Sequence, residues 1–427
     1  MDIKRSSGVL LPIFSLPSNY GIGTLGRAAY DFVYFLSEAG QSWWQVLPVG
    51  PAGSGNSPYY SLSSFDGNPL FIDLDLLIAD GKLTKEEVVA IDWGSDESRV
   101  DYGKVIAGRK KLFSKFTDEE VQAMFKKQWN DLRDYAHSKG IGLIGDLPIY
   151  VPLDSKDVKE NKRFFQLDEE GLPVAVAGCP PDYFSEEGQL WNNPLYDWDE
   201  MKKDGYGFWI RRVGVASELY DMIRIDHFRG LSTYWSVPAG EKNAVNGHWE
   251  QGPGLEFVNM LTSWFHDTKF IAEDLGNLTE DVYDLLKQSK LPGMKVLVFA
   301  FDPEANSSYL PHKIEENTVC YVGTHDNATV MEWVDTVSKE EFEFAKTYMG
   351  LNREEGYNWG FIRSGMESKA FLFIAQAADL IGLGKEARIN TPGTVGDQNW
   401  SWRMSSDSLS PEICQKLLNY TKMYGRI

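Results

Sequence analysis

Cysteine is scarce in this sequence, with Cys179, Cys320 and Cys414 the three examples among 427 residues. Because these cysteines are far apart, they form neither a disulfide framework nor the close spacing of a cysteine metal site. A cytoplasmic location is expected, since proteins of a reducing compartment rarely carry disulfides. The sequence also lacks any run of about 18 apolar residues, so it predicts no transmembrane helix.

Basic residues are fewer than acidic ones, with 42 Lys and Arg against 62 Asp and Glu, which gives a net charge of −20. Because an acidic protein repels polyanions, neither nucleic acid nor an anionic membrane is expected as a partner. The six histidines include no HxH or HExxH spacing, which disfavours a zinc hydrolase. The lack of a GxSxG motif disfavours a serine hydrolase. The sequence therefore predicts neither a zinc-hydrolase site nor a serine-hydrolase site.

Aromatic residues, by contrast, are abundant at 13% of the chain, including 14 Trp. They suit either a large core or flat platforms for a ligand such as a sugar ring. Segments 55–77 and 173–198 combine aromatic residues with Asn, Ser and Pro. Such segments make poor cores, and they favour binding of a polyhydroxylated ligand.

A short apolar run that ends near Gly, Pro, Asp or Asn recurs eight times and predicts buried parallel strands. Helical patterns lie between many of these runs, for example at 25–40. This alternation predicts a (β/α)8 TIM barrel. A doubly wound open sheet is the alternative, but no glycine-rich phosphate loop directly follows the first run. The runs are 8–17, 42–51, 142–151, 222–228, 270–276, 294–302, 318–327 and 387–394.

Three helix starts are marked by capping residues. Thr117 with Glu120, and Ser338 with Glu341, have the spacing of a capping box. Thr279 precedes another helical pattern as a candidate N-cap. We therefore expect helices to begin directly after these residues.

The spacing between the predicted strands is uneven. About 90 residues separate the second and third runs, and about 70 separate the third and fourth, more than one helix needs. We therefore expect one catalytic barrel over 1–427, with inserted subdomains at 52–135 and 152–215. The insertions belong to loops at the face where the strands end.

Acidic side chains follow three of the runs at their carboxyl ends, where barrels of this type place their active sites. These residues are Asp226, Glu273 and Asp326. A single Asp beside an Arg at a strand end is usually an ion pair. Three acids at separate strand ends of one barrel instead favour catalysis.

Two of these acids have different surroundings in the sequence. Arg224 and Asp226 are two residues apart and point to the same side of a strand, whereas His227 is expected to point away. The charge of Arg224 keeps Asp226 ionised, which suits a nucleophile. Glu273 follows the apolar residues "FIA", and an apolar setting raises a carboxyl pKa, which suits a general acid. Carboxyl groups with separated pKa values are typical of glycoside chemistry.

A set of motifs along the chain resembles those of amylomaltases, the 4-α-glucanotransferases related to the α-amylase superfamily. The resemblance extends over nearly the whole chain. It implies a (β/α)8 barrel with inserted subdomains that transfers α-1,4-glucan segments between maltooligosaccharides, amylose, or starch- or glycogen-derived glucans. The motifs are "GIGTLG", "SPYYSLSSFDGNP", "GDLPIYV", "PPDYFSEEGQLWNNPLYDW", "RIDHFRG", "YWSVPAGE", "IAEDLG", "LPGMKVLVFAFD", "GTHDN" and "NTPGT".

The resemblance also implies roles for individual residues. It implies that Asp226 is the nucleophile, Glu273 the acid/base, and Asp326 a third carboxylate that stabilises the transition state. Arg224 and His325 match residues that line the same subsite. Further sugar contacts are implied for Tyr59, Asp146, Gln189, Trp191 and Asn390.

The implied mechanism is a retaining double displacement through a covalent glycosyl-enzyme, and it needs no metal or organic cofactor. Retention predicts roughly 5–5.5 Å between the carboxyl groups of Asp226 and Glu273. Two alternatives stay open. One is a glucan hydrolase with a more open acceptor site, and the other is a catalytically silent glucan-binding protein.

The chain departs from the family pattern in one region. Between segments 108–113 and 127–136 the family carries several dozen more residues than this sequence does. The insertion at 52–135 is therefore expected to be shortened near 114–126. Cys179 also stands where the family has a small apolar residue.

Overall fold

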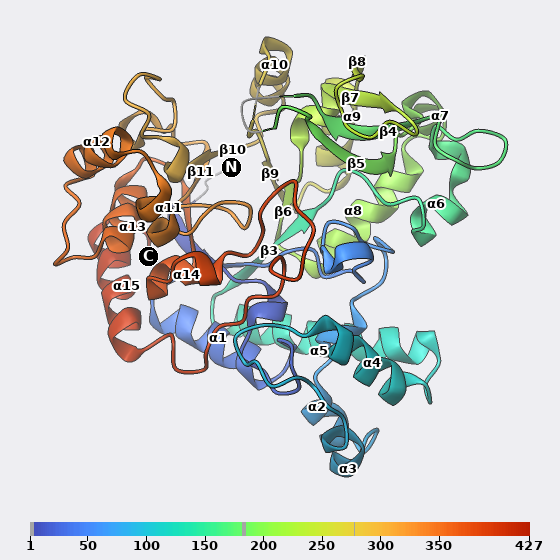
Figure 1. Cartoon of the computed structure of the whole chain (residues 1–427), viewed down its shortest axis with the longest axis horizontal. Coiled ribbons are helices and arrows are strands. Elements are labelled where there is room, and N and C mark those ends of the chain that lie inside the picture. The colour runs from blue at the N-terminus through green and yellow to red at the C-terminus, as the bar shows by residue number, and fades with distance from the viewer. Residues whose placement is uncertain (1–3, 182–184, 277) are drawn as a thin grey trace. The chain divides into compact units, whose positions relative to one another are not determined.

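The structure is a computed structural model that describes residues 4–181, 185–276 and 278–427 (Figure 1). Eight parallel strands form a nearly closed barrel in the order β10-β11-β12-β1-β2-β3-β6-β9, which confirms the predicted fold class. The strands are β1 (Ser6–Leu10), β2 (Trp43–Gln45), β3 (Gly142–Leu147), β6 (Met222–Ile225), β9 (Lys269–Ala272), β10 (Gly293–Val296), β11 (Thr318–Tyr321) and β12 (Leu372–Gln376).

Seven of the eight predicted runs overlap a barrel strand, and the eighth does not. Segment 387–394 begins at the end of a short 3-10 helix (Lys385–Ala387) and continues as a loop. The missing strand is β12, which pairs in parallel with β1 and β11. Its sequence "LFIAQ" is buried along its whole length and runs directly into a helix. A continuous apolar run of this kind has no alternation that distinguishes a buried strand from a buried helix.

All three helices predicted from capping residues begin directly after those residues. Both capping boxes are present, at the N-termini of α5 and α12. Thr279 is the N-cap residue of α10, but its side chain makes no capping hydrogen bond there. The helices are α1 (Arg27–Glu38), α2 (Leu74–Ala79), α3 (Lys85–Val89), α4 (Tyr102–Phe113), α5 (Asp118–Ser138), α6 (Lys156–Glu160), α7 (Trp198–Lys203), α8 (Gly207–Leu219), α9 (Gly254–Trp264), α10 (Glu280–Ser289), α11 (Val330–Thr336), α12 (Lys339–Met349), α13 (Tyr357–Glu367), α14 (Ala377–Ile381) and α15 (Pro411–Met423).

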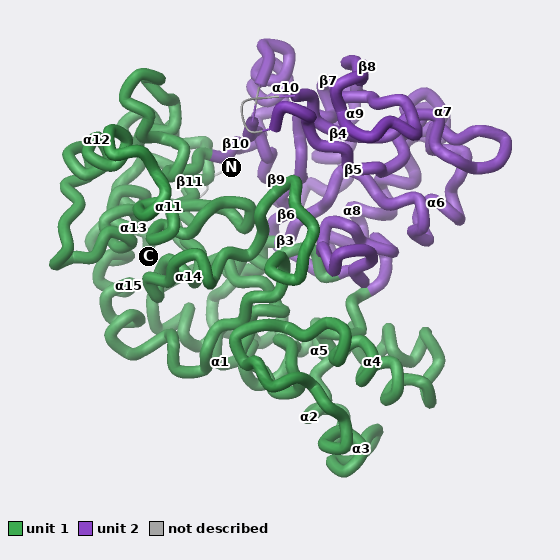
Figure 2. The backbone as a smooth tube through the Cα atoms, in the orientation of Figure 1, with its two compact units in different colours: residues 1–49, 67–144, 295–427 green, residues 50–66, 145–294 purple. Residues whose placement is uncertain are grey.

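The chain divides into two compact units, which Figure 2 shows in green and purple. Unit 1 comprises residues 1–49, 67–144 and 295–427, and unit 2 comprises residues 50–66 and 145–294. Unit 1 holds the long helices α1, α5 and α15. In unit 1 the connection from α4 to α5 is a short turn at 114–117, closed by the capping box of α5.

Unit 2 contains an antiparallel sheet in the order β5-β4-β7-β8. Two of its strands, β4 (Ala175–Cys179) and β5 (Gln189–Pro194), lie within the predicted insertion 152–215. The other two, β7 (Thr233–Pro238) and β8 (His248–Gln251), follow β6. Val176 of β4 and Val237 of β7 form a small buried apolar cluster with Ala244, and Trp235 packs against it. Trp191 of β5 contacts His227, which lies two residues after the end of β6.

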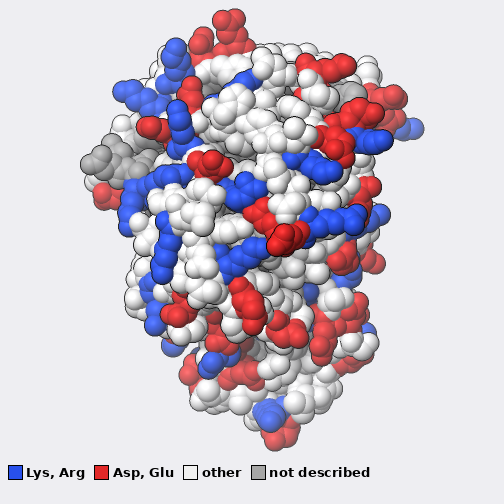
Figure 3. Space-filling view, turned by 90° about the vertical axis from the view of Figure 1, so that its left-hand side faces the viewer, with Lys and Arg blue, Asp and Glu red and all other residues white. Residues whose placement is uncertain are grey.

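The surface carries both signs of charge. On the face shown in Figure 3, Lys and Arg side chains lie among Asp and Glu side chains. Within the part of the chain that the structure describes, none of the helices is both long enough and apolar enough to span a membrane.

Candidate active site

Arg224 and Asp226 lie on either side of the residue at which β6 ends. The buried Arg224 donates from Nη1 to Asp226 Oδ1 at 3.0 Å and to Asp146 Oδ2 at 2.6 Å. The backbone N–H of Asp226 donates to the carbonyl of Leu147 at 3.1 Å, which ties Asp226 to the end of β3. One guanidinium therefore joins a carboxylate within β3 to the carboxylate that follows the neighbouring strand β6. This contact requires Arg224 and Asp226 to face the same side, as strand alternation predicts.

Glu273 directly follows β9, and backbone donors hold both of its carboxyl oxygens. The N–H of His227 donates to Oε2 at 2.7 Å, and the N–H of Leu275 donates to Oε1 at 3.2 Å. Arg224 Nη2 lies 3.9 Å from the same Oε2. Asp226 and Glu273 are therefore both neighbours of one guanidinium.

The surroundings of Glu273 favour its protonated form. Burial raises the pKa of Glu273 to about 8, and the charges of Asp226 and Asp274 act in the same direction. Arg224 and the N–H of His227 oppose this shift. Because burial outweighs the opposing contributions, the protonated form of Glu273 is favoured, which suits a proton donor.

Asp146 accepts hydrogen bonds from both Arg224 and Tyr59. The Tyr59 hydroxyl donates to Asp146 Oδ2 at 2.6 Å, the same oxygen that Arg224 contacts. The Asp146 side chain is fully buried. Burial by itself lowers the pKa of Arg224, but the charge of Asp146 and smaller contributions from other neighbours raise it well above its ordinary value. Asp146 thus anchors a permanent positive charge next to Asp226 and Glu273.

Gln189 and Trp191, from the start of β5, lie next to the end of β6. Trp191 Nε1 donates to Gln189 Oε1 at 3.3 Å. The Trp191 ring meets the His227 ring edge to face, with 4.8 Å between their centroids. The centroid of the Tyr150 ring lies 6.2 Å from that of Trp191. An aromatic wall therefore adjoins the residue that follows Asp226.

The sequence did not predict the contribution of His227. The expected alternation does not extend to this residue, because β6 ends at Ile225 and His227 has a left-handed backbone with φ 49° and ψ 49°. This conformation accompanies the N–H bond to Glu273. Burial, followed by the charge of Arg229, lowers the pKa of His227 to about 3, so the imidazole is neutral. A backbone donor has no sequence signature, since any residue except proline supplies one.

Asp326 belongs to the loop between β11 and α11. Asn390 Nδ2 donates to Asp326 Oδ1 at 2.6 Å, and His325 Nε2 lies 3.3 Å from Asp326 Oδ2. The N–H of Asn390 donates to the carbonyl of His325 at 3.1 Å. The structure therefore brings His325, Asp326 and Asn390 together, although Asn390 follows no strand directly.

The predicted site residues divide between the two compact units. Unit 2 contains the cluster around Arg224, and unit 1 contains the cluster around Asp326. The unit 2 residues are Tyr59, Asp146, Gln189, Trp191, Arg224, Asp226 and Glu273, and the unit 1 residues are His325, Asp326 and Asn390.

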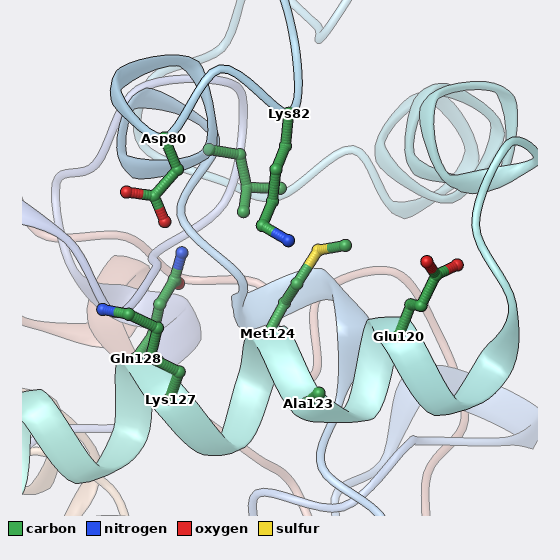
Figure 4. Close-up of a pocket in the computed structure, with 8 residues that line it drawn as sticks. Asp80, Lys82, Glu120, Ala123, Met124, Lys127 and Gln128 are labelled. Atoms are coloured by element: carbon green, nitrogen blue, oxygen red, sulfur yellow. The ribbon is translucent and has the colours of Figure 1, made fainter.

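A cavity of about 220 Å³ lies elsewhere in unit 1, between α2 and α5 (Figure 4). Leu77, Lys82, Met124 and Lys127 are among its lining residues, and none of the predicted site residues lines it. Among the described residues, no group of three or more His, Cys, Asp or Glu side chains is arranged to hold a metal ion.

Comparison with known proteins gives matches over most of the chain. The family profile described as 4-alpha-glucanotransferase, glycoside hydrolase family 77, matches residues 11–122 and 119–409. A 4-alpha-glucanotransferase of Clostridium butyricum is 41% identical over 484 aligned positions, covering 97% of this chain and 99% of the relative. The alignment has more positions than the 427 residues of this chain, so the relative carries additional residues. The two matched segments of the family profile meet at 119–122, within the 114–126 region.

Solved structures also match over nearly the whole chain. The amylomaltase from Streptococcus agalactiae, solved in complex with acarbose, superposes with a TM-score of 0.93 at 35% identity. That match covers 99% of this chain and 100% of the other chain. An α-amylase from Lactobacillus plantarum, at 13% identity, superposes with a TM-score of 0.52 over 99% of this chain and 80% of that one. This second likeness concerns the fold alone.

Proposed function

Because the chain belongs to the 4-alpha-glucanotransferases of glycoside hydrolase family 77 (EC 2.4.1.25), which act on α-1,4-glucans, we propose that it works by retaining double displacement. In this mechanism a glucan segment is held covalently on the enzyme between donor and acceptor. The observation that carries the proposal is the pair Asp226 and Glu273 beside one guanidinium, with burial raising the pKa of Glu273.

In the first half of the reaction, the Asp226 carboxylate attacks the anomeric carbon of an α-1,4-linked glucose unit. Glu273 gives its proton to the glycosidic oxygen, and the shortened glucan leaves. The glycosyl unit is then an ester of Asp226. The ion pair with Arg224 at 3.0 Å favours the ionised, nucleophilic form of Asp226 before the attack.

In the second half, an acceptor glucan presents its 4-hydroxyl, and Glu273, now ionised, takes the proton of that hydroxyl. The acceptor oxygen attacks the anomeric carbon and releases Asp226, which restores an α-1,4 bond. Two inversions give net retention. Trp191 and Tyr59 contribute to glucan binding and to the exclusion of water, which would otherwise replace the acceptor.

The unit 1 cluster supplies the third carboxylate. We propose that Asp326 and His325 bind sugar hydroxyls of the reacting glucose and that Asp326 stabilises its oxocarbenium-like transition state. The "GTHDN" motif and its place after β11 of the same parallel sheet support this role. Asn390 orients Asp326 through the 2.6 Å bond to Oδ1.

The remaining predicted residues have supporting roles in this proposal. Gln189 orients the Trp191 indole, as their 3.3 Å hydrogen bond supports. Asp146 acts through Arg224 and Tyr59, since its own side chain is fully buried. No cofactor enters the proposed reaction. A cytoplasmic location is also proposed, and the small number of cysteines in the sequence supports it.

Incubation with maltotriose and chromatography of the products tests the proposal. Transfer produces glucose together with a ladder of longer maltooligosaccharides. Shorter sugars alone, with rising reducing ends, would show hydrolysis and contradict the proposed transfer. An unchanged substrate would contradict any catalytic function and favour a glucan-binding protein.

A further inference from the structure

Arg388, a residue without an assigned role in the proposed reaction, joins three segments of unit 1. Its Nε donates to the carbonyl of Asn390 at 2.9 Å, and its Nη2 donates to the carbonyl of Asp326 at 3.2 Å. Its Nη1 contacts Glu332 Oε1, in the first turn of α11, at 3.2 Å. A planar guanidinium can serve three acceptors at once, whereas a lysine ammonium on a flexible stem cannot reproduce this geometry.

Hydrogen bonds hold both the backbone carbonyl and the side-chain carboxylate of Asp326. Arg388 holds its backbone carbonyl, and Asn390 holds its carboxylate at 2.6 Å. The N–H of Asn390 also donates to the carbonyl of His325. Segment 388–390 therefore sets the position of the two loop residues that carry the proposed sugar contacts.

The burial of Glu332 argues that its ion pair with Arg388 does not serve stability alone. Its side chain is buried, and its Oε2 has no hydrogen-bond partner among the described residues. Burial of a carboxylate with one unpaired oxygen is unfavourable, and apolar residues of similar volume often stabilise a fold better. The ion pair is therefore better explained by the geometry that it imposes on Arg388 than by stability.

We propose that Arg388, oriented by Glu332, is a positioning residue that holds the Asp326 carboxylate in the geometry needed for the transition state. The proposal rests on the catalytic role proposed above for Asp326. Arg388 itself need not touch the substrate, because it acts through the backbone of Asp326 and through Asn390.

A double-mutant cycle with Arg388→Lys and Asp326→Asn tests this role. In the wild-type background, Arg388→Lys is expected to lower kcat by about 10- to 100-fold with KM changed less than about threefold, as for residues that orient an active-site group. In the Asp326→Asn background, the same change is expected to lower kcat by no more than about threefold, because the group that it positions is already gone.

Arg363 provides a matched control in the same unit. It pairs with Glu355 at 2.7 Å and donates to the carbonyl of Met349, and its side chain is 24% exposed against 23% for Arg388. Arg363→Lys is expected to lower Tm as much as Arg388→Lys does but to leave kcat unchanged. Glu332→Gln, which keeps an acceptor for Arg388, is expected to retain most activity, and Glu332→Ala is expected to approach Arg388→Lys.

Three results would overturn the proposal. One is an equal loss of kcat from Arg388→Lys in both backgrounds, which would show a general structural role. Another is an unchanged kcat in Arg388→Lys. The third is full activity in Asp326→Asn, which would remove the catalytic role of Asp326 itself and so is distinguishable from the first two.

Discussion

The carboxylates after β6 and β9 lie beside a charged guanidinium, whereas the carboxylate in the loop after β11 accepts a hydrogen bond from a neutral amide. Asp226 and Glu273 share the guanidinium of Arg224, and their side chains are 26% and 11% exposed. The Asp326 side chain is 40% exposed, and its Oδ1 accepts from the neutral amide of Asn390. Charged interactions are stronger where water is excluded, so the two sites suit different tasks.

In the proposed reaction, this difference separates bond making from stabilisation of the transition state. The surroundings of Arg224 favour a protonated Glu273 next to an Asp226 carboxylate that is paired with a cation. Asn390 holds the half-exposed Asp326 carboxylate in place for its proposed contact with the reacting glucose. Substitutions that change the charge should therefore be most damaging in the first site.

The largest expected effect is that of Asp226→Asn. The amide cannot form the glycosyl ester, so kcat in the maltotriose assay should fall by about 10⁴-fold or more. Tm should change little, since Asn keeps the shape of Asp. Asp281→Asn is the matched control, because Asp281 is a carboxylate of the same unit that accepts from Ser232 at 2.6 Å. Activity retained by Asp226→Asn would remove Asp226 from the nucleophile role.

The next effect is that of Glu273→Gln, which removes the proton donor. We expect kcat to fall by about 10²- to 10⁴-fold. In the wild type, kcat/KM should decline as the pH rises through about 8, because Glu273 then loses the proton that it must donate. The decline should be absent from the pH profile of Glu273→Gln. An alkaline limb that persists unchanged in this variant would assign that ionisation to another group.

A smaller effect is expected for Asp326→Asn. Because this carboxylate is proposed to stabilise charge and not to form a bond, kcat should fall by about 10²- to 10³-fold. The alkaline limb of the pH profile should stay where it is, since protonation of Glu273 is controlled in the other cluster. A loss equal to that of Asp226→Asn would abolish the distinction between the two sites.

The sequence allowed prediction of what depends on local pattern. Seven barrel strands and the acids that follow them could be read from apolar runs and the residues at their ends. The eighth strand, β12, was missed because its run merges with a helix, and Asn390 was therefore assigned to a strand end. Glu332 was missed because an acidic residue in the first turn of a helix usually faces solvent. Its burial depends on Arg388, a contact between segments far apart in the chain.

The smallest effect tests the backbone bond from His227 to Glu273. His227→Val places a β-branched residue at a φ of 49°, which it adopts poorly, so the N–H should turn away from Glu273. Burial raises the pKa of Glu273, and the charges of Asp226 and Asp274 raise it further. Arg224 and the N–H of His227 lower it. The alkaline limb of kcat/KM should therefore move to higher pH, and kcat should fall by about tenfold. His227→Asn, which tolerates the left-handed conformation, should keep the limb in place. Equal shifts in both variants would instead assign the effect to the lost contact between His227 and Trp191.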